Sequence, residues 1–187
     1  MVNKRLLVLL ECAIFAAIGL ILSLVPTDIG SSFSISLGMI PIYVIGIRRG
    51  FWAAGFTGLL WGLLHFVVGK AYILTPWQAV IEYVIAFVFV AFAGINSSKI
   101  RYLIIAKSYK KAISLAWVSM FVGGFAKYFW HYVAGVIFWG AYAFKGWSAQ
   151  LFSIVMNGAS FLATLIVAGI VVSYLIKLAP NLFFSKK

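Results

Sequence analysis

Long apolar runs separated by short basic segments dominate this chain of 187 residues. A helix that crosses a membrane needs about 20 apolar residues, or about 17 at the short end. Hydrophobic residues make up 65% of the chain, charged residues make up only 10%, and the mean hydropathy is +1.11. Soluble domains are about 25% charged. The composition therefore predicts an integral membrane protein, folded as a single membrane domain over residues 1–187.

Six apolar segments predict an all-α fold, a bundle of six transmembrane helices. Pro26 and Asp28 end the first segment, and Arg48-Arg49-Gly50 closes the second, which is short. The first run is longer than the roughly 7–15 residues of a signal-peptide core, so we expect it to remain as a helix. The expected helices cover residues 6–25, 35–47, 51–68, 77–95, 112–137 and 150–178.

The basic residues are distributed unevenly among the segments between these helices. If the N-terminus is cytoplasmic, the outer loops hold only Lys70 and Lys145, while Lys127 lies within a helix. Positive loops mark the cytoplasmic side of a membrane, so we expect both termini to be cytoplasmic. A net charge of +12 could also indicate nucleic-acid binding, but these residues lie between apolar runs. The other twelve basic residues would face the cytoplasm: Lys4, Arg5, Arg48, Arg49, Lys99, Arg101, Lys107, Lys110, Lys111, Lys177, Lys186 and Lys187.

Catalysis finds little support in the sequence. Cys12 is the only cysteine, which excludes an internal disulfide and a multi-cysteine metal site. His65 and His131 lack metalloprotease spacing, and no phosphate-binding loop is present. Glu82 has no second carboxylate nearby for acid–base or metal chemistry. We therefore expect no enzyme, no cofactor and no metal.

Polar side chains are concentrated in residues 127–157, within and beside apolar segments. Lys127, His131 and Gly135 follow one another at intervals of four residues, so they share one helix face. Glu82 is an acid inside a different apolar segment, where a charge costs about 2.5–3.5 kcal/mol on insertion scales. We interpret these groups as a pocket for a small aromatic cation. The alternatives are a structural hydrogen bond or an ion pair with Lys127 for Glu82, a snorkelling amine for Lys127, and a packing role for His131.

Large aromatic residues accompany these polar groups. They could form the aromatic belt at the lipid interface, or their π faces could stabilise a bound cation. Asn157 could hydrogen-bond a heterocycle or another helix. The aromatic candidates are Trp61, Tyr72, Tyr83, Trp130, Trp139, Tyr142 and Trp147.

The first apolar segment contains Ala13 and Ala17, a pair of small residues four positions apart. Such spacing allows two helices to approach closely in lipid. The pair could pack inside the bundle or form a docking face for another membrane protein.

Several motifs taken together resemble one known family. In order they are A-x-x-x-A, R-R-G, G-x-A-Y-I-L, Q-A-x-x-E-Y, K-Y-F-x-H-x-x-A-G-x-I-F-W-x-x-Y-A-x-K-G-W and N-G. This set is similar to the thiamine-specific S component of energy-coupling factor (ECF) transporters, over nearly the whole chain. The resemblance implies a bacterial plasma-membrane protein that captures extracellular thiamine. It also implies a transmembrane T subunit and two cytoplasmic ATPases as partners.

The resemblance also implies roles for particular residues. Ala13 and Ala17 would face the T subunit. Two positions depart from the family pattern, because residues 30–33 lack the expected tryptophan and Phe152 replaces a tyrosine. Phe33 could substitute for the tryptophan. The expected ligand contacts are Trp61, Tyr72, Glu82, Tyr83, Lys127, His131, Gly135, Trp139, Ser153 and Asn157.

Three other functions stay open from the residues alone. The chain could be an S component for a different vitamin. It could be an intramembrane enzyme that uses Glu82 and His131 on a lipid-borne substrate. It could also be a structural scaffold, in which these residues serve only stability.

Overall fold

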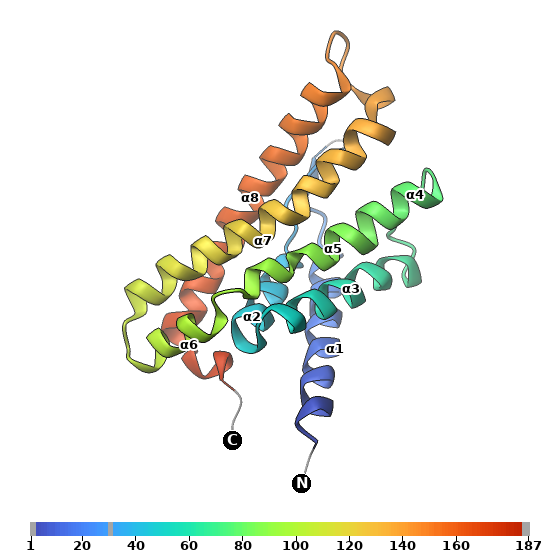
Figure 1. Cartoon of the computed structure of the whole chain (residues 1–187). Coiled ribbons are helices and arrows are strands. Elements are labelled where there is room, and N and C mark those ends of the chain that lie inside the picture. The colour runs from blue at the N-terminus through green and yellow to red at the C-terminus, as the bar shows by residue number, and fades with distance from the viewer. Residues whose placement is uncertain (1–2, 30–31, 185–187) are drawn as a thin grey trace.

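The computed structural model describes residues 3–29 and 32–184 and consists almost entirely of helices (Figure 1). Five helices exceed ten residues: α1 (Lys4–Ser23), α2 (Met39–Arg49), α3 (Phe51–Val67), α7 (Tyr109–Phe138) and α8 (Ala149–Leu178). A further helical segment changes its hydrogen-bond pattern along its length: α4 (Pro76–Ala79), the π-helix η1 (Val80–Ile85), α5 (Ala86–Phe89) and the 3₁₀-helix η2 (Val90–Gly94). The shorter elements are α6 (Ser97–Ile105), η3 (Gly140–Tyr142), η4 (Pro180–Phe183) and the strands β1 (Asp28–Ile29) and β2 (Phe33–Ser34).

Within the described part of the chain, four helical segments are long and apolar enough to cross a membrane: Lys4–Ser23, Pro76–Gly94, Tyr109–Phe138 and Ala149–Leu178. The 17-residue α3 is a shorter apolar helix, and the 11-residue α2 spans only about 16 Å at 1.5 Å per residue. The prediction of an all-α membrane protein is confirmed, whereas the count of six transmembrane helices stays a prediction.

Helices α7 and α8 run side by side along the length of the molecule, and α3 packs against the segment from α4 to η2 (Figure 1). Glycines on α3 permit this second contact. A Cβ atom added to Gly58 or Gly62 would collide with the backbone carbonyl of Phe87 or Tyr83, respectively. The two helices therefore touch backbone to backbone, which is how small residues let helices associate in lipid.

Two segments differ from the sequence prediction. Residues 35–38, expected to be helical, instead lead from an antiparallel hairpin of β1 and β2 into α2. The hairpin region is fixed to α8, since the N–H groups of Ser34 and Ser36 donate to the hydroxyls of Ser160 and Thr164 at 3.1 and 3.0 Å. These α8 hydroxyls satisfy backbone donors that a helix would otherwise use internally. The second difference is α6, which lies in the segment 96–111 that we expected to be a connection.

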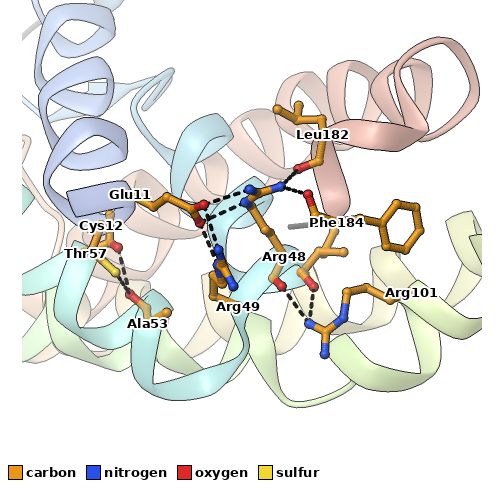
Figure 2. A network of polar contacts seen from close by, with 10 residues as sticks. Glu11, Cys12, Arg48, Arg49, Ala53, Thr57, Arg101, Leu182 and Phe184 are labelled. Atoms are coloured by element: carbon orange, nitrogen blue, oxygen red, sulfur yellow. Dashed lines mark hydrogen bonds and ion pairs between the residues drawn. The ribbon is translucent and has the colours of Figure 1, made fainter. Parts of the chain in front are cut away.

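The end of α2 is a centre of charged contacts (Figure 2). Arg48 and Arg49 each donate two hydrogen bonds, of 2.6–2.9 Å, to the carboxylate of Glu11 on α1. Arg48 also donates to the carbonyls of Leu182 and Phe184. Arg101 on α6 donates to the Arg48 carbonyl at 2.8 Å and also to that of Ile47. We call Glu11, Arg48, Arg49 and Arg101 the arginine hub, because they join α1, α2, α6 and the end of the described chain.

The arginine hub makes Glu11 important for stability. Glu11→Ala leaves two arginines without their counter-charge, in a site where the paired side chains are only about 15% exposed. The cost of removing one partner lies between the roughly 1 kcal/mol of an exposed pair and the roughly 3–5 kcal/mol of a fully buried one, so we expect the melting temperature to fall by several degrees. Thermal unfolding followed by tryptophan fluorescence measures this. Asp28→Asn is the matched control, because it removes an exposed acid with no ion pair among the described residues. Equal melting temperatures for both variants would contradict the role of Glu11.

Candidate functional site

A cavity of about 480 Å³ opens between the end of α1, the β-hairpin, α3, η1, α7 and α8. Small-molecule sites typically occupy about 300–1,000 Å³. All ten residues predicted to contact a ligand line this cavity, although they come from four separate helical segments and a loop. They are Trp61, Tyr72, Glu82, Tyr83, Lys127, His131, Gly135, Trp139, Ser153 and Asn157.

Glu82 lies on the π-helix η1, and both of its oxygens accept hydrogen bonds. The indole Nε1–H of Trp139 donates to Oε1 at 2.9 Å, and the side-chain amide of Gln78 donates to Oε2. A π-helix within a longer helical segment is frequent at functional sites. Here it carries Glu82 and its neighbour Tyr83 to the same cavity. The carboxylate is therefore held in place, with its charge turned toward the cavity.

Gln78 is a residue that the sequence analysis did not select. It is fully buried, and its amide also donates to the carbonyl of Tyr72, while its oxygen accepts from the backbone N–H of Leu74. Gln78 thus connects the loop before α4 to Glu82. Gln78 lies four residues before Glu82, which places both on one helix face. This spacing could have indicated from the sequence that the two side chains meet.

Lys127 and His131 contact each other directly, as their spacing predicted. The Lys127 amine lies 2.9 Å from Nε2 of His131, which is a hydrogen-bonding distance. An ammonium group can only donate, so beside a charged Lys127 this ring nitrogen is an unprotonated acceptor. The amine also lies 4.8 Å from the ring centroid of Phe87 and 4.6 Å from that of Tyr128. Lys127 is buried in the cavity wall and does not snorkel to the surface.

Glu82 and Lys127 do not form an ion pair in the part of the chain that the structure describes. The two opposite charges line the same cavity and are held by other partners, the acid by Gln78 and Trp139 and the amine by His131. The ion-pair alternative for Glu82 is therefore not observed. Both groups face the cavity with hydrogen-bonding capacity left for a ligand.

Helix α8 contributes Ser153 and Asn157. The Asn157 amide nitrogen donates to the carbonyl and hydroxyl of Ser153 at 3.1 and 3.2 Å, which directs its oxygen away from these partners. Ser153 itself donates to the carbonyl of Tyr132 on α7 at 2.8 Å. A Cβ atom at Gly135 would collide with the Ser153 hydroxyl. Gly135, which the sequence analysis places among the ligand contacts, thus also serves the α7–α8 contact.

The two departures from the family pattern also fall at the cavity. Phe33 of β2 and Phe152 of α8 both line it, as does Ser32. Gly30 and Ser31 lie outside the described residues. Phe33 therefore stands where an aromatic side chain from the hairpin can cover a ligand.

Three aromatic candidates do not line the cavity. Trp130 packs against Phe89 and Phe129 on another face of α7, where its indole N–H has no partner among residues 3–29 and 32–184. Tyr142 and Trp147 are partly exposed beyond the end of α7, although the Tyr142 ring lies 5.3 Å from that of Trp139. Trp130 lies within α7 but packs on another face, and Tyr142 and Trp147 lie beyond the end of α7 at Phe138, so proximity in sequence to His131 does not bring these rings to the cavity.

Ala13 and Ala17 are exposed on α1, whereas Ala16 and Gly19 are buried. The alanine pair therefore faces away from the bundle and does not serve its internal packing. Among the residues that the structure describes, no three or more histidine, cysteine, aspartate or glutamate side chains come together as metal ligands.

Comparison with known proteins gives a consistent result. The family model described as "Thiamine transporter protein" matches residues 9–184. The thiamine transporter ThiT of Lacticaseibacillus paracasei is 38% identical, over 98% of this chain and 94% of its own length. The thiamine transporter ThiT of Bacillus subtilis is 31% identical, over 99% and 98%.

A solved structure of ThiT from Listeria monocytogenes is 68% identical and superposes with a TM-score of 0.97, covering 98% of this chain and 100% of that one. These matches include all the helices that line the cavity. The family resemblance inferred from the motifs is confirmed, and the relatives are named as transporters rather than enzymes. The chain belongs to the thiamine transporter protein family.

Proposed function

We propose that this chain is the thiamine-binding S component of an ECF transporter in the bacterial plasma membrane. It captures extracellular thiamine and delivers it to the cytoplasm together with a T subunit and two ATPases. The observation that carries this proposal is the convergence of one carboxylate, one amine and several aromatic rings on a single cavity of about 480 Å³. Membership of the family supports thiamine as the ligand.

The cavity matches both halves of thiamine, an aminopyrimidine and a permanently charged thiazolium. Glu82 offsets the positive charge and accepts from the pyrimidine amine. Trp139 and His131 stack on the rings, with His131 neutral, since an imidazolium would repel the thiazolium. Lys127 and the amide nitrogen of Asn157 donate to ring heteroatoms. Flat aromatic faces add about 0.5–2 kcal/mol for each close cation contact.

The topology that we propose has six transmembrane helices and both termini in the cytoplasm. Two observations support it. The excess of basic residues falls on one side of such an arrangement. In addition, Arg48 bonds both Glu11 of α1 and the carbonyls of Leu182 and Phe184, so the first half of α1 and the end of the described chain lie on the same side of the bundle (Figure 2). The cavity then opens toward the outside.

Replacing the carboxylate tests the charge pairing. Glu82→Gln keeps the size of the side chain but removes its charge. It also replaces one of the two acceptor oxygens with an NH2 donor, so only one of the donors Trp139 and Gln78 keeps its acceptor. A hydrogen bond to a charged group contributes about 1.5–3 kcal/mol, so thiamine affinity should fall by about 10- to 100-fold. Tryptophan fluorescence of the purified protein, titrated with thiamine, measures the change, since indoles line the cavity.

The control for this titration is Glu11→Gln, which removes a carboxylate of the same bundle at the arginine hub. Its thiamine affinity should equal that of the unchanged protein. If Glu82→Gln also binds thiamine with unchanged affinity, Glu82 does not pair with the thiazolium.

The alanine pair provides a test of docking that is independent of binding. Ala13→Trp places a bulky side chain on the exposed face of α1. We expect thiamine binding to be retained and transport in cells or proteoliposomes with the T subunit and ATPases to be abolished. Ile166→Trp, on an exposed position of α8, is the matched control and should transport normally. Normal transport by Ala13→Trp would exclude α1 as the docking face.

A further inference from the structure

His65 is a buried polar residue of the cavity that neither the family pattern nor the proposed mechanism uses. We propose that its Nε2 atom accepts a hydrogen bond from the hydroxyl group of the ligand's hydroxyethyl chain. This inference rests on the proposed function, because it takes thiamine as the ligand. It assigns a further binding residue on α3, a helix that otherwise contributes only Trp61 to the predicted contacts.

The hydrogen bonding of His65 fixes its tautomer. The ring nitrogen Nδ1 lies 2.8 Å from the carbonyl oxygen of Trp61, one turn earlier on α3. A carbonyl can only accept, so Nδ1 carries the proton of a neutral imidazole. The other nitrogen, Nε2, then has a free lone pair and can only accept.

This Nε2 atom has no hydrogen-bond partner among residues 3–29 and 32–184, although the side chain is only 9% exposed and lines the cavity. The fully enclosed side-chain atoms without a partner among the described residues are the Tyr43 hydroxyl and the Trp130 indole nitrogen, so Nε2 of His65 is open to the cavity. An acceptor in a cavity wall is instead satisfied by whatever enters the cavity. The arrangement therefore indicates a place for a donor on a bound molecule.

The ring of His65 is also immobilised, as a binding group should be. Its centroid lies 5.6 Å from that of Trp61, 5.8 Å from that of Tyr83 and 5.3 Å from that of Phe87. Two of these rings come from the helical segment that carries Glu82. His65 is therefore held in a fixed position relative to the carboxylate proposed to bind the other end of the ligand.

Thiamine offers two conventional donor groups, the pyrimidine amine and the hydroxyl. Glu82 is an acceptor with a full negative charge, so it competes best for the amine beside the cationic portion of the ligand. The hydroxyl remains, and a neutral imidazole nitrogen is a suitable acceptor for it. His65 would thus distinguish ligands by the presence of this hydroxyl.

The test compares His65→Phe, which keeps the aromatic bulk, with His65→Gln, whose side-chain oxygen can take the place of Nε2. Binding is titrated with thiamine and with an analogue that carries an ethyl group in place of the hydroxyethyl group. One neutral hydrogen bond is worth about 2- to 10-fold in affinity. We expect His65→Phe to lose this factor for thiamine and to lose nothing for the ethyl analogue, whereas His65→Gln should retain most of the thiamine affinity.

The other outcomes would overturn the proposal. An equal loss of affinity for thiamine and the ethyl analogue shows that His65 acts on packing alone. Oxythiamine lacks the amine. If His65→Phe weakens the binding of thiamine and of the ethyl analogue but not that of oxythiamine, His65 binds the amine and not the hydroxyl. Failure of the proposed function looks different, because the unchanged protein then binds no thiamine. Melting temperatures without ligand verify that both variants are folded.

Discussion

A carboxylate within an apolar helix bundle costs about 2.5–3.5 kcal/mol on insertion scales unless the protein compensates it. Glu82 meets this requirement through two donors, the indole of Trp139 and the amide of Gln78. The two donors come from different parts of the fold, since Trp139 follows α7 and Gln78 belongs to α4. Holding one charge in place thus brings the end of α7 against the helical segment 76–94.

The hydrogen bonds that hold Glu82 in place also involve the loop before α4. Gln78 can orient its amide toward Glu82 only because its other hydrogen-bonding groups are occupied by the backbone of Tyr72 and Leu74. The backbone N–H of Tyr72 in turn donates to the hydroxyl of Tyr83 at 2.9 Å. The loop is therefore fixed to the helix that carries the acid. This explains how Tyr72, an exposed loop residue, comes to line a cavity defined mainly by helices.

The long helices could be predicted from the sequence because their cause is local. An apolar run in lipid must satisfy its own backbone hydrogen bonds, and a helix does so within the segment. The predicted ranges 51–68, 77–95 and 150–178 accordingly agree with the observed segments to within one residue at each end. The π-helix around Glu82 and the hairpin before α2 were missed. Both depend on neighbours, such as the Tyr83 carbonyl packed on Gly62 and the α8 hydroxyls that bind the hairpin backbone.

The candidate site could be predicted residue by residue only through the resemblance to a family. Periodicity alone placed Lys127 and His131 on one face, and it could have added Gln78 beside Glu82. Periodicity could not indicate that Glu11 pairs with Arg48. Arg48 lies 37 residues further along the chain, and a contact between residues so far apart leaves no local pattern. The three aromatic residues excluded from the cavity illustrate the converse, since they are near His131 in sequence but beyond a helix end or on another helix face.

Helix α1 connects the two polar regions of the molecule. Its last residue, Ser23, accepts a hydrogen bond from the Trp61 indole at the cavity, and Glu11 belongs to the arginine hub. Ala13 and Ala17 are exposed between them. At 1.5 Å per residue, Ala13 lies about 15 Å along the helix axis from Ser23 and about 3 Å from Glu11. A change at the exposed alanines is thus too distant to touch the ligand and adjacent to the contacts that fix α1 in the bundle. The exposed alanines and the Ser23 contact at the cavity therefore lie on separate parts of one helix.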